Sequence, residues 1–465
     1  MAFLIGGANS ATGDFINNSL RFNDGDTASL SRSFGSSGNN KTFTFSCWVK
    51  FADRKTGSSA SDCCHGIFAS EEDSGYQFFI TTDENQILRI ADYQSEYKLH
   101  LQTNRRFTDC TAWYHLVVIF DTTQGTAADR CKVYVNGQKQ TSFSTAVYPD
   151  QNQDLYGNEN NTHYIGRRGG SNTMHFDGYI AEVHFVDGTA VAATNFGEVD
   201  DNGVWVPIEY TGSHGTQGFY LQFKQTGTSA NASGIGADTS GNGLHFTCTN
   251  LAATDISTDT PQNSFATLNP LNKFGSPVTH EGNLEYDSNS SSGSSLVSSI
   301  APSNGKWYVE VKALTSTIHI GVSEVGLDSF RSKGQGASRP NINYQYGGGV
   351  EIDGSNVDSE ATFTTNDIIG FALNLDDGEL IIYKNGTALN SGTAYNLHTN
   401  TTHGNTGFSV QTATGSGNTK ASFNFGSPAF AISSGNSDAN GYGNFEYAVP
   451  SGYYALCTKN LAEYG

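Results

Sequence analysis

The sequence predicts an all-β protein made of two antiparallel β-sandwiches joined by a linker. Short apolar runs with two-residue alternation recur along the whole chain, separated by turn residues. No segment has a sustained apolar period of 3.6 residues, so long helices are not expected. Residues 250–270 have little periodicity and contain two prolines, which is typical of a linker between domains.

In the first half, the clearest strand is 41–51, where Phe43, Phe45 and other apolar residues alternate with polar ones. Residues 113–121 are apolar on both faces, as in a central strand of a sandwich. Residues 131–137 alternate again and end at an Asn-Gly pair suited to a tight hairpin turn. A further strand is expected within 176–188, and 188–197 is the best candidate for a short helix.

In the second half, alternation returns at 305–314, and 367–389 is expected to be a meander with turns at Asp377-Gly378 and Asn385-Gly386. The motif Tyr-x-Asn-Gly therefore occurs in both halves, at 134–137 and 383–386. The residues around the two copies differ, so we interpret the motif as one hairpin used in two distinct sandwiches rather than as a recent duplication.

Composition limits the partners. The 465 residues carry a net charge of −20, which disfavours nucleic acid and anionic membranes because both repel an acidic protein. Seven cysteines without repeated spacing do not form a disulfide framework. No apolar run is long enough for membrane insertion, and the N-terminus lacks the basic region of a signal peptide, so synthesis in a cytoplasm is expected.

Residues 18–188 resemble the LamG/concanavalin A-like family. The resemblance is carried by "FTFSCWVKF", by "WYHLVVIFD" leading to "KVYVNG", and by "HYIGRRGG" leading to "FDGYIAEVHFVDG". The following piece, "FGEVDDNGVWVPIEYTGSHGTQGFYLQF", is similar to a module found after LamG-like domains in virion proteins of marine bacteriophages.

The second half resembles the SPRY family through "GKWYVEV", "IHIGVS", "DIIGFALNLDDGELIIYKNG" and "ASFNFG". Both resemblances imply jelly-roll-type, concanavalin A-like sandwiches that bind ligands. The expected organisation is an N-terminal anchor or arm at 1–17, a LamG-like sandwich at 18–249, a linker at 250–274 and a SPRY-like sandwich at 275–465.

Two loops are candidate ligand sites, since tyrosine stacks on sugar rings and arginine binds carboxylates of acidic glycans. The candidate ligand-binding residues are Tyr156, Tyr164, Arg167, Arg168 and His175 in the first half, and Tyr344, Tyr346 and Asp353 in the second. For each loop, a solvated loop tip without a ligand is the competing interpretation.

Ca²⁺ is the only cofactor that the sequence suggests, because LamG-like domains often carry it at a sandwich rim. Loop placement alone makes Asp83, Asp121, Asp200 and Asp201 the candidate ligands. No catalytic residues are predicted: Glu198 and Asp200 alternate, but the further acid that would complete a glycosidase motif does not follow.

These observations predict a non-enzymatic structural protein on the surface of a bacteriophage virion, as a fibre, spike tip or capsid decoration. Its expected partners are host cell-surface polysaccharide, other virion proteins and further copies of itself, with a trimer favoured. The alternatives are a polysaccharide-degrading enzyme on the same scaffold and a cellular secreted adhesin.

Overall fold

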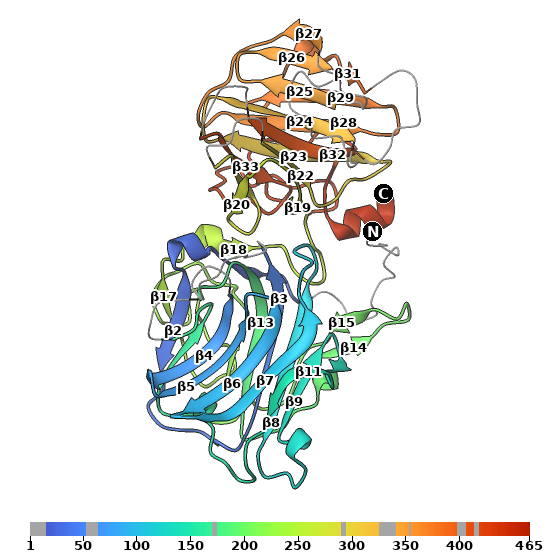
Figure 1. The fold of residues 1–465 in the computed structure, drawn as a ribbon. Helices are drawn as coiled ribbons and strands as arrows, with labels where there is room; N and C mark the ends of the chain where they lie inside the picture. The colour runs from blue at the N-terminus through green and yellow to red at the C-terminus, as the bar shows by residue number, and fades with distance from the viewer. Residues whose placement is uncertain are drawn as a thin grey trace. The chain divides into compact units, whose positions relative to one another are not determined.

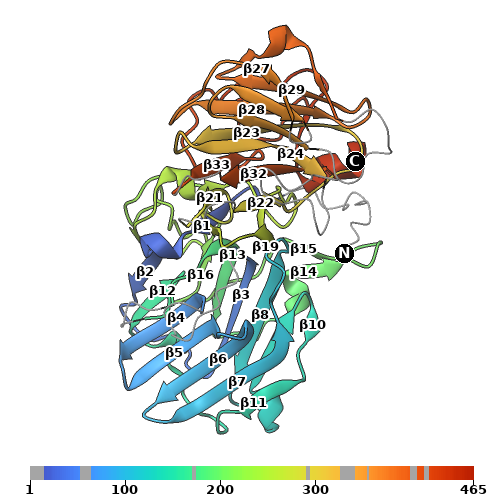
Figure 2. The same ribbon diagram turned by 45° about the horizontal axis from the view of Figure 1, so that its top comes forward.

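The computed structural model describes residues 15–52, 64–169, 174–289, 294–324, 341–352, 355–397, 406–412 and 418–465. The chain forms two compact units (Figures 1 and 2). Residues 8–262 form the N-terminal unit, and the C-terminal unit is built from residues 263–465. Each unit is a sandwich of two largely antiparallel sheets, as the alternating apolar pattern predicted.

The N-terminal unit contains two large sheets and a separate hairpin. Its first sheet has the order β10-β9-β8-β3-β13-β1-β18, with β16 beside β13: β1 (Ser19–Phe22), β3 (Thr42–Phe51), β8 (Tyr114–Asp121), β9 (Cys131–Val135), β10 (Gln138–Lys139), β13 (Gly178–Asp187), β16 (Phe219–Leu221) and β18 (Ile256–Ser257). Its second sheet has the order β11-β7-β6-β5-β4-β12-β2-β17: β2 (Ser29–Ser33), β4 (Gly66–Asp73), β5 (Tyr76–Thr82), β6 (Ile87–Gln94), β7 (Tyr97–Arg106), β11 (Phe143–Val147), β12 (Thr162–Ile165) and β17 (Thr247–Thr249). The hairpin pairs β14 (Gly197–Val199) with β15 (Trp205–Pro207), and the 3₁₀ turns are η1 (Asp24–Asp26), η2 (Ala127–Asp129), η3 (Tyr156–Asn158), η4 (Ala193–Asn195) and η5 (Ala253–Asp255).

Phenylalanine rings fill the space between these two sheets. Phe43 stacks on Phe120 at 4.5 Å between ring centroids, and Phe45 stacks on Phe68 at 4.8 Å. All four rings are fully buried. Burial of such large apolar side chains is the main favourable term in the stability of the sandwich.

A third layer covers the outer face of the first sheet. Val117 and Val186 of this face form a buried cluster with Val191 and Phe196, which follow β13 in the chain. Asp259, near the end of the N-terminal unit, pairs with Lys50 of β3 at 2.7 Å, and both side chains are only 2% exposed. The segment that follows β13 is therefore part of the N-terminal unit.

The C-terminal unit also contains two sheets. The first has the order β19-β22-β32-β24-β25-β26-β27: β19 (Leu268–Phe274), β22 (Ser295–Ser298), β24 (Ile318–Glu324), β25 (Asn341–Gln345), β26 (Gly349–Ile352), β27 (Ser355–Ser359) and β32 (Thr406–Thr412). The second has the order β20-β21-β33-β23-β28-β29-β30, with β31 beside β29 and β34 beside β23: β20 (Val278–His280), β21 (Glu285–Asp287), β23 (Lys306–Ala313), β28 (Ile368–Asn374), β29 (Glu379–Lys384), β30 (Thr387–Ala388), β31 (Tyr395–Asn396), β33 (Lys420–Asn424) and β34 (Tyr454–Ala455). The turn η6 (Asn390–Gly392) and the helix α2 (Thr458–Tyr464) complete the unit.

A buried carboxylate fixes the last part of the C-terminal unit. Glu310 of β23 is fully buried and accepts backbone hydrogen bonds from Glu446 (2.9 Å) and Tyr447 (2.8 Å). The side chains of Tyr308 and Asn424 donate to the same carboxylate at 3.2 and 3.3 Å. Burial raises the pKa of Glu310, while these donors act in the opposite direction.

The two Tyr-x-Asn-Gly motifs have the same local structure. The backbone N–H of Asn136 donates to the carbonyl of His115 (2.9 Å), while its side-chain oxygen accepts from the N–H of His115 (2.7 Å). Asn385 makes the same two hydrogen bonds with the backbone of Ile368, and each is 2.8 Å long. Both asparagines have positive φ, 47° and 49°. In both units the motif thus ties the turn after β9 or β29 to the start of the neighbouring strand, β8 or β28.

Two expectations differ from the structure. Residues 250–274 are divided between the units, since β18 pairs with β1 and β19 pairs with β22. Short paired stretches in a polar sequence carry too little periodicity to be recognised. The helix expected within 188–197 is only the turn η4, whose residues pack on the first sheet. Within the described residues, every helix is too short or too polar to span a lipid bilayer.

Candidate functional site

The outer face of the second sheet carries a continuous row of side chains across five strands. Directly opposed residues give the row Tyr164 (β12), Ala69 (β4), Phe79 (β5), Ala91 (β6) and His100 (β7). Phe79, Ala69 and Ala91 form a small apolar cluster that is separate from the sandwich core. At about 4.8 Å per strand, the row is about 19 Å long.

A second row lies beside the first. It consists of Glu71 (β4), Gln77 (β5), Tyr93 (β6) and Tyr97 (β7), each opposite the next across the sheet. Tyr97 is 39% exposed and stacks on His100 at 4.4 Å. We call the two rows, together with Arg89, Arg167 and Arg168, the Arg–Tyr face; the four strands β4–β7 that carry most of it lie side by side in Figure 1.

Two arginines pack on the central ring of this face. The guanidinium carbon of Arg168 is 4.1 Å from the ring centroid of Phe79, and that of Arg89 is 5.0 Å from it. Arg168 Nη2 donates to Gln77 Oε1 at 2.5 Å. Arg89 donates to His100 Nε2 (3.1 Å) and to the Tyr97 hydroxyl (2.6 Å). Burial lowers the pKa of Arg168, and the neighbouring charge of Arg89 lowers it further.

The third arginine lies at one end of the row. The guanidinium carbon of Arg167 is 4.7 Å from the ring centroid of Tyr164, and its Nε donates to the carbonyl of Arg168 at 3.1 Å. Among the described residues, none of the three arginines forms an ion pair, whereas Arg21 of the same unit pairs with Asp255 at 3.2 Å.

Glu71 is the one carboxylate among the residues that define the face. Its Oε1 accepts a hydrogen bond from Gln77 Nε2 at 3.3 Å, and its Oε2 is buried without a donor. Burial raises the pKa of Glu71, although the charges of Arg168 and Arg167 oppose this. A single carboxylate provides an acceptor for a hydroxyl group, but hydrolysis of a glycosidic bond uses two carboxylates.

The structure brings together three of the five ligand-binding residues expected in the first half, namely Tyr164, Arg167 and Arg168. Tyr156 lies in η3, where it stacks on Tyr76 at 5.1 Å and donates to Glu72 at 3.0 Å. His175 is only 5% exposed, so the expectation that it meets a ligand is corrected. Its backbone forms an isolated antiparallel bridge with that of Arg167.

The second candidate loop is not supported as a site. Tyr344 is fully buried, donates to the carbonyl of Ala361 and packs against Phe363 at 4.9 Å, so it is a core residue. Tyr346, two residues later, is 38% exposed and stacks near His319. Asp353 lies outside the described residues.

Three of the expected Ca²⁺ ligands stabilise their own turns. Asp83 accepts from the N–H groups of residues 85 and 87, and Asp200 accepts from those of residues 202 and 204. Asp121 accepts from the N–H and hydroxyl of Thr123. Asp201 follows Asp200 in the β14–β15 turn. Across the parts of the chain that the structure describes, no three His, Cys, Asp or Glu side chains are grouped as a metal site requires.

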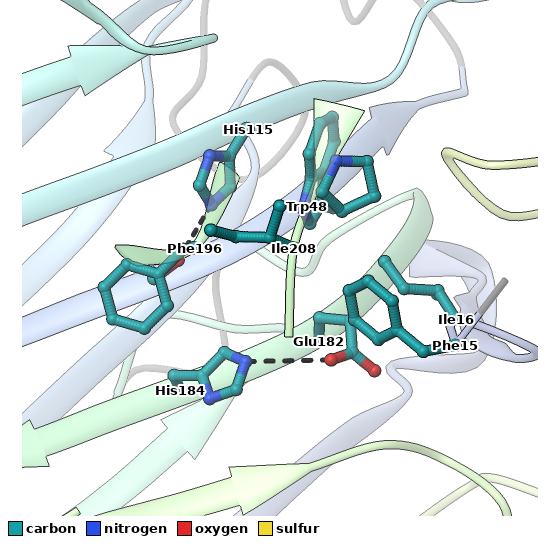
Figure 3. Close-up of a pocket in the computed structure, with 10 residues that line it drawn as sticks. Phe15, Ile16, Trp48, His115, Glu182, His184, Phe196 and Ile208 are labelled. Carbon is teal, nitrogen blue, oxygen red and sulfur yellow. Dashed lines mark hydrogen bonds and ion pairs between the residues drawn. The ribbon is translucent and has the colours of Figure 1, made fainter. Parts of the chain in front are cut away.

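A small pocket lies on the outer face of the first sheet, under the third layer. Its lining includes Trp48, His115, Glu182 and His184 (Figure 3). His115 Nε2 is 2.9 Å from Ser46 Oγ, a spacing that suggests an activated nucleophile. However, Trp205 Nε1 donates to His115 Nδ1 at 3.0 Å, and an indole nitrogen is only a donor. The proton of His115 therefore lies on Nε2 and is donated to Ser46, so His115 is not a base for this serine.

The other half of the pocket is a buried polar chain. Tyr220 donates to Glu182, whose Oε2 is 3.7 Å from His184 Nε2, and His184 Nδ1 is 3.1 Å from His214 Nε2. Burial lowers the pKa of His214 to about 4 and that of His115 to about 3. These groups connect the third layer to β13, and their contacts with one another give them a structural role.

Comparison with known proteins identifies the fold of the N-terminal unit. Residues 23–194 match the model of the concanavalin A-like lectin/glucanases superfamily, in its Laminin_G_3 form. A search of curated proteins finds no match to the sequence.

Several solved structures are similar to parts of the chain. They include the SPRY domain of human HERC1 (14% identity, 34% of this chain and 96% of that chain, TM-score 0.29) and a SAP-like pentraxin from Limulus polyphemus (15% identity, 39% and 80%, TM-score 0.29). A human SPRY domain is also similar (14% identity, 35% and 98%, TM-score 0.24). These scores are too low to carry an argument. The family match and the sheet topology show that residues 23–194 have the concanavalin A-like lectin/glucanase fold.

Proposed function

We propose that the protein is a non-enzymatic carbohydrate-binding protein and that the Arg–Tyr face is its binding site. The observation that carries this proposal is the combination of aromatic rings, partly exposed guanidinium groups and one carboxylate along two adjoining rows of a lectin/glucanase-type sheet. A sugar ring has an apolar face that stacks on aromatic rings and hydroxyl groups that bond with polar side chains.

The dimensions of the face suit an oligosaccharide. The row from Tyr164 to His100 is about 19 Å long, the length of several linked sugars. At its centre Ala69, Phe79 and Ala91 are at most 1% exposed, and Arg89 and Arg168 lie over the Phe79 ring, so a bound chain would meet these guanidinium groups. Rigid strands hold these side chains, so little conformational entropy is lost when a ligand binds.

The glycosidase alternative requires a second carboxylate about 5 Å from the first, or somewhat farther for inversion. Glu71 is the one carboxylate in the two rows, and Asp73, which is near enough to raise its pKa, lies outside them at the end of β4, so we favour binding over hydrolysis. Incubation of the protein with polysaccharide tests this choice, because new reducing ends or shortened chains would establish the enzyme.

We further propose that the protein is a bacteriophage virion component, as a fibre, spike tip or capsid decoration, which binds host cell-surface polysaccharide. This part rests on the resemblance of residues 196–223 to a module of phage virion proteins. Other virion proteins and further copies of the chain, with a trimer favoured, are the partners it implies. Neighbouring genes for virion proteins would support the proposal, and genes of a cellular secretion system would overturn it in favour of an adhesin.

A glycan array with the full chain tests the binding site. Tyr97→Ala is expected to weaken binding, because it removes an exposed ring from the face. Tyr346→Ala is the matched control, since this tyrosine is 38% exposed, compared with 39% for Tyr97, but lies in the C-terminal unit. Loss of binding in the control variant alone would move the site to the second sandwich. A parallel array with EDTA tests the predicted involvement of Ca²⁺.

A further inference from the structure

We infer that the Arg–Tyr face selects a linear acidic polysaccharide and that Arg89, Arg167 and Arg168 bind its carboxylate groups. This inference rests on the proposed function and specifies the class of glycan. It follows from the hydrogen bonds of the three guanidinium groups and from the excess of positive over negative charge within the face.

The guanidinium groups are oriented before any ligand arrives. Arg89 donates hydrogen bonds from Nε to His100 and from Nη2 to the Tyr97 hydroxyl, and its guanidinium group packs on the ring of Phe79. Arg167 donates a hydrogen bond from Nε to the carbonyl of Arg168, and its guanidinium group lies over the ring of Tyr164. Hydrogen bonds at one edge of each planar guanidinium group and an aromatic ring beneath it fix its orientation, so binding an anion requires little further ordering of the side chain.

Several N–H groups of Arg89 and Arg167 donate no hydrogen bond within the described residues. Arg167 donates through Nε, and within the described part of the chain neither of its terminal nitrogens has an acceptor. Arg89 likewise makes no hydrogen bond through Nη1 within the described residues. Two parallel N–H donors on a planar fork match the two oxygens of a carboxylate.

Within the residues that define the face, three guanidinium groups are opposed by one carboxylate, that of Glu71. The chain has 45 acidic and 25 basic Lys and Arg residues, so most cations have carboxylates available to pair with. Lys50 and Arg21 in the same unit are paired with Asp259 and Asp255. Three arginines on one face without such a pair are complementary to an anionic ligand. Glu71 is the only opposing carboxylate in the defined face, and it lies beside Gln77.

The ligand must also be long and must carry sugar rings. The arginines are distributed along the row from Tyr164 to the His100 end, so one small anion does not reach them all. A polymer with a carboxylate on each sugar, such as a polyuronate, supplies repeated anions for the arginines and sugar rings for the aromatic side chains. The net charge of −20 on the chain opposes any polyanion at long range, so the choice of a polyuronate over nucleic acid rests on the local match between the arginine forks and carboxylates and on the aromatic rings for the sugars.

Binding to polygalacturonate, measured by calorimetry with the full chain, tests the inference. Fully methyl-esterified polygalacturonate has the same backbone without the charge and is expected to bind at least about tenfold more weakly. Arg167→Gln and Arg89→Gln are each expected to weaken binding to the acid form about tenfold, and binding should also weaken as salt rises. Lys139→Gln is the matched control, because Lys139 is an exposed cation (42%) on β10 of the first sheet.

The outcomes separate this inference from the proposed function. Equal binding of the acid and esterified polymers, with no effect of the arginine variants, would overturn acid selectivity while leaving glycan binding intact. Binding of dextran sulfate or single-stranded DNA, but not polygalacturonate, would overturn the assignment to carboxylates. Failure of every glycan to bind would overturn both proposals. Arg167→Lys should lose much of the affinity although it keeps the charge, because the fork is lost.

Discussion

Asp259 makes the most consequential polar contact of the third layer, and its removal should destabilise the N-terminal unit strongly. Its Oδ2 is 2.7 Å from Lys50 Nζ, its Oδ1 accepts from Trp113 Nε1 at 3.0 Å, and the paired side chains are each 2% exposed. Asp259→Ala leaves a buried ammonium group without this carboxylate, and we expect the free energy of unfolding to fall by about 3–5 kcal/mol. Total stabilities are about 5–15 kcal/mol, so the loss is a large part of the whole.

Thermal unfolding of the full chain measures this effect, since the two units have separate cores. For a unit of this size, we expect the transition of the N-terminal unit to fall by about 10 °C while the other transition stays in place. The double replacement of Lys50 by Met and Asp259 by Leu should recover most of the stability. Glu96→Ala, in an exposed pair with Lys98, should leave both transitions nearly unchanged. An Asp259→Ala protein as stable as the Glu96→Ala protein would refute the reasoning.

Three further predictions concern the same scaffold. Asn136→Ala and Asn385→Ala should each destabilise their own unit by about 1–2 kcal/mol, visible as shifts of separate unfolding transitions, because each removes a hydrogen-bond acceptor and a residue suited to positive φ. Glu310→Ala should make the segment around Glu446 sensitive to limited proteolysis, since two buried N–H groups lose their acceptor; resistance equal to wild type would contradict this. The pKa of His115 is lowered to about 3 by burial, below the value of about 6.5 in an unfolded chain, so the neutral form stabilises the folded state. Acid titration of unfolding should therefore show stability falling from pH about 6.5 toward 3, by up to about 1.4 kcal/mol per unit for this group, and His115→Phe should reduce that slope.

The strands could be predicted from the sequence because alternation reports which face is buried. The run 41–51 is β3 almost residue for residue, and the doubly apolar run 113–121 contains β8, which lies between β9 and β3 under the third layer. The third layer itself was not predicted. Its residues contact the first sheet through single side chains such as Phe196, and such contacts leave no period in the sequence.

The candidate site was predicted only in part, for a similar reason. Arg167 and Arg168 stand out because they are adjacent in a Gly-rich stretch, whereas Phe79 and Arg89 become their neighbours only through the order and register of β12, β4, β5 and β6. Register between strands is set by the whole sheet and is not readable from one strand. For Tyr344, the alternation with Ile342 was a usable signal, since both residues face the core.

The central claim is that the Arg–Tyr face binds a glycan, and the side-chain Nε–H signals of the arginines test it directly. In the full chain titrated with a polygalacturonate oligosaccharide, the NMR signals of Arg89, Arg167 and Arg168 should shift together and saturate at one affinity. Arg130, which donates to three backbone carbonyls elsewhere in the N-terminal unit, should not change. Saturable binding that leaves all three signals of the face unmoved would contradict the account.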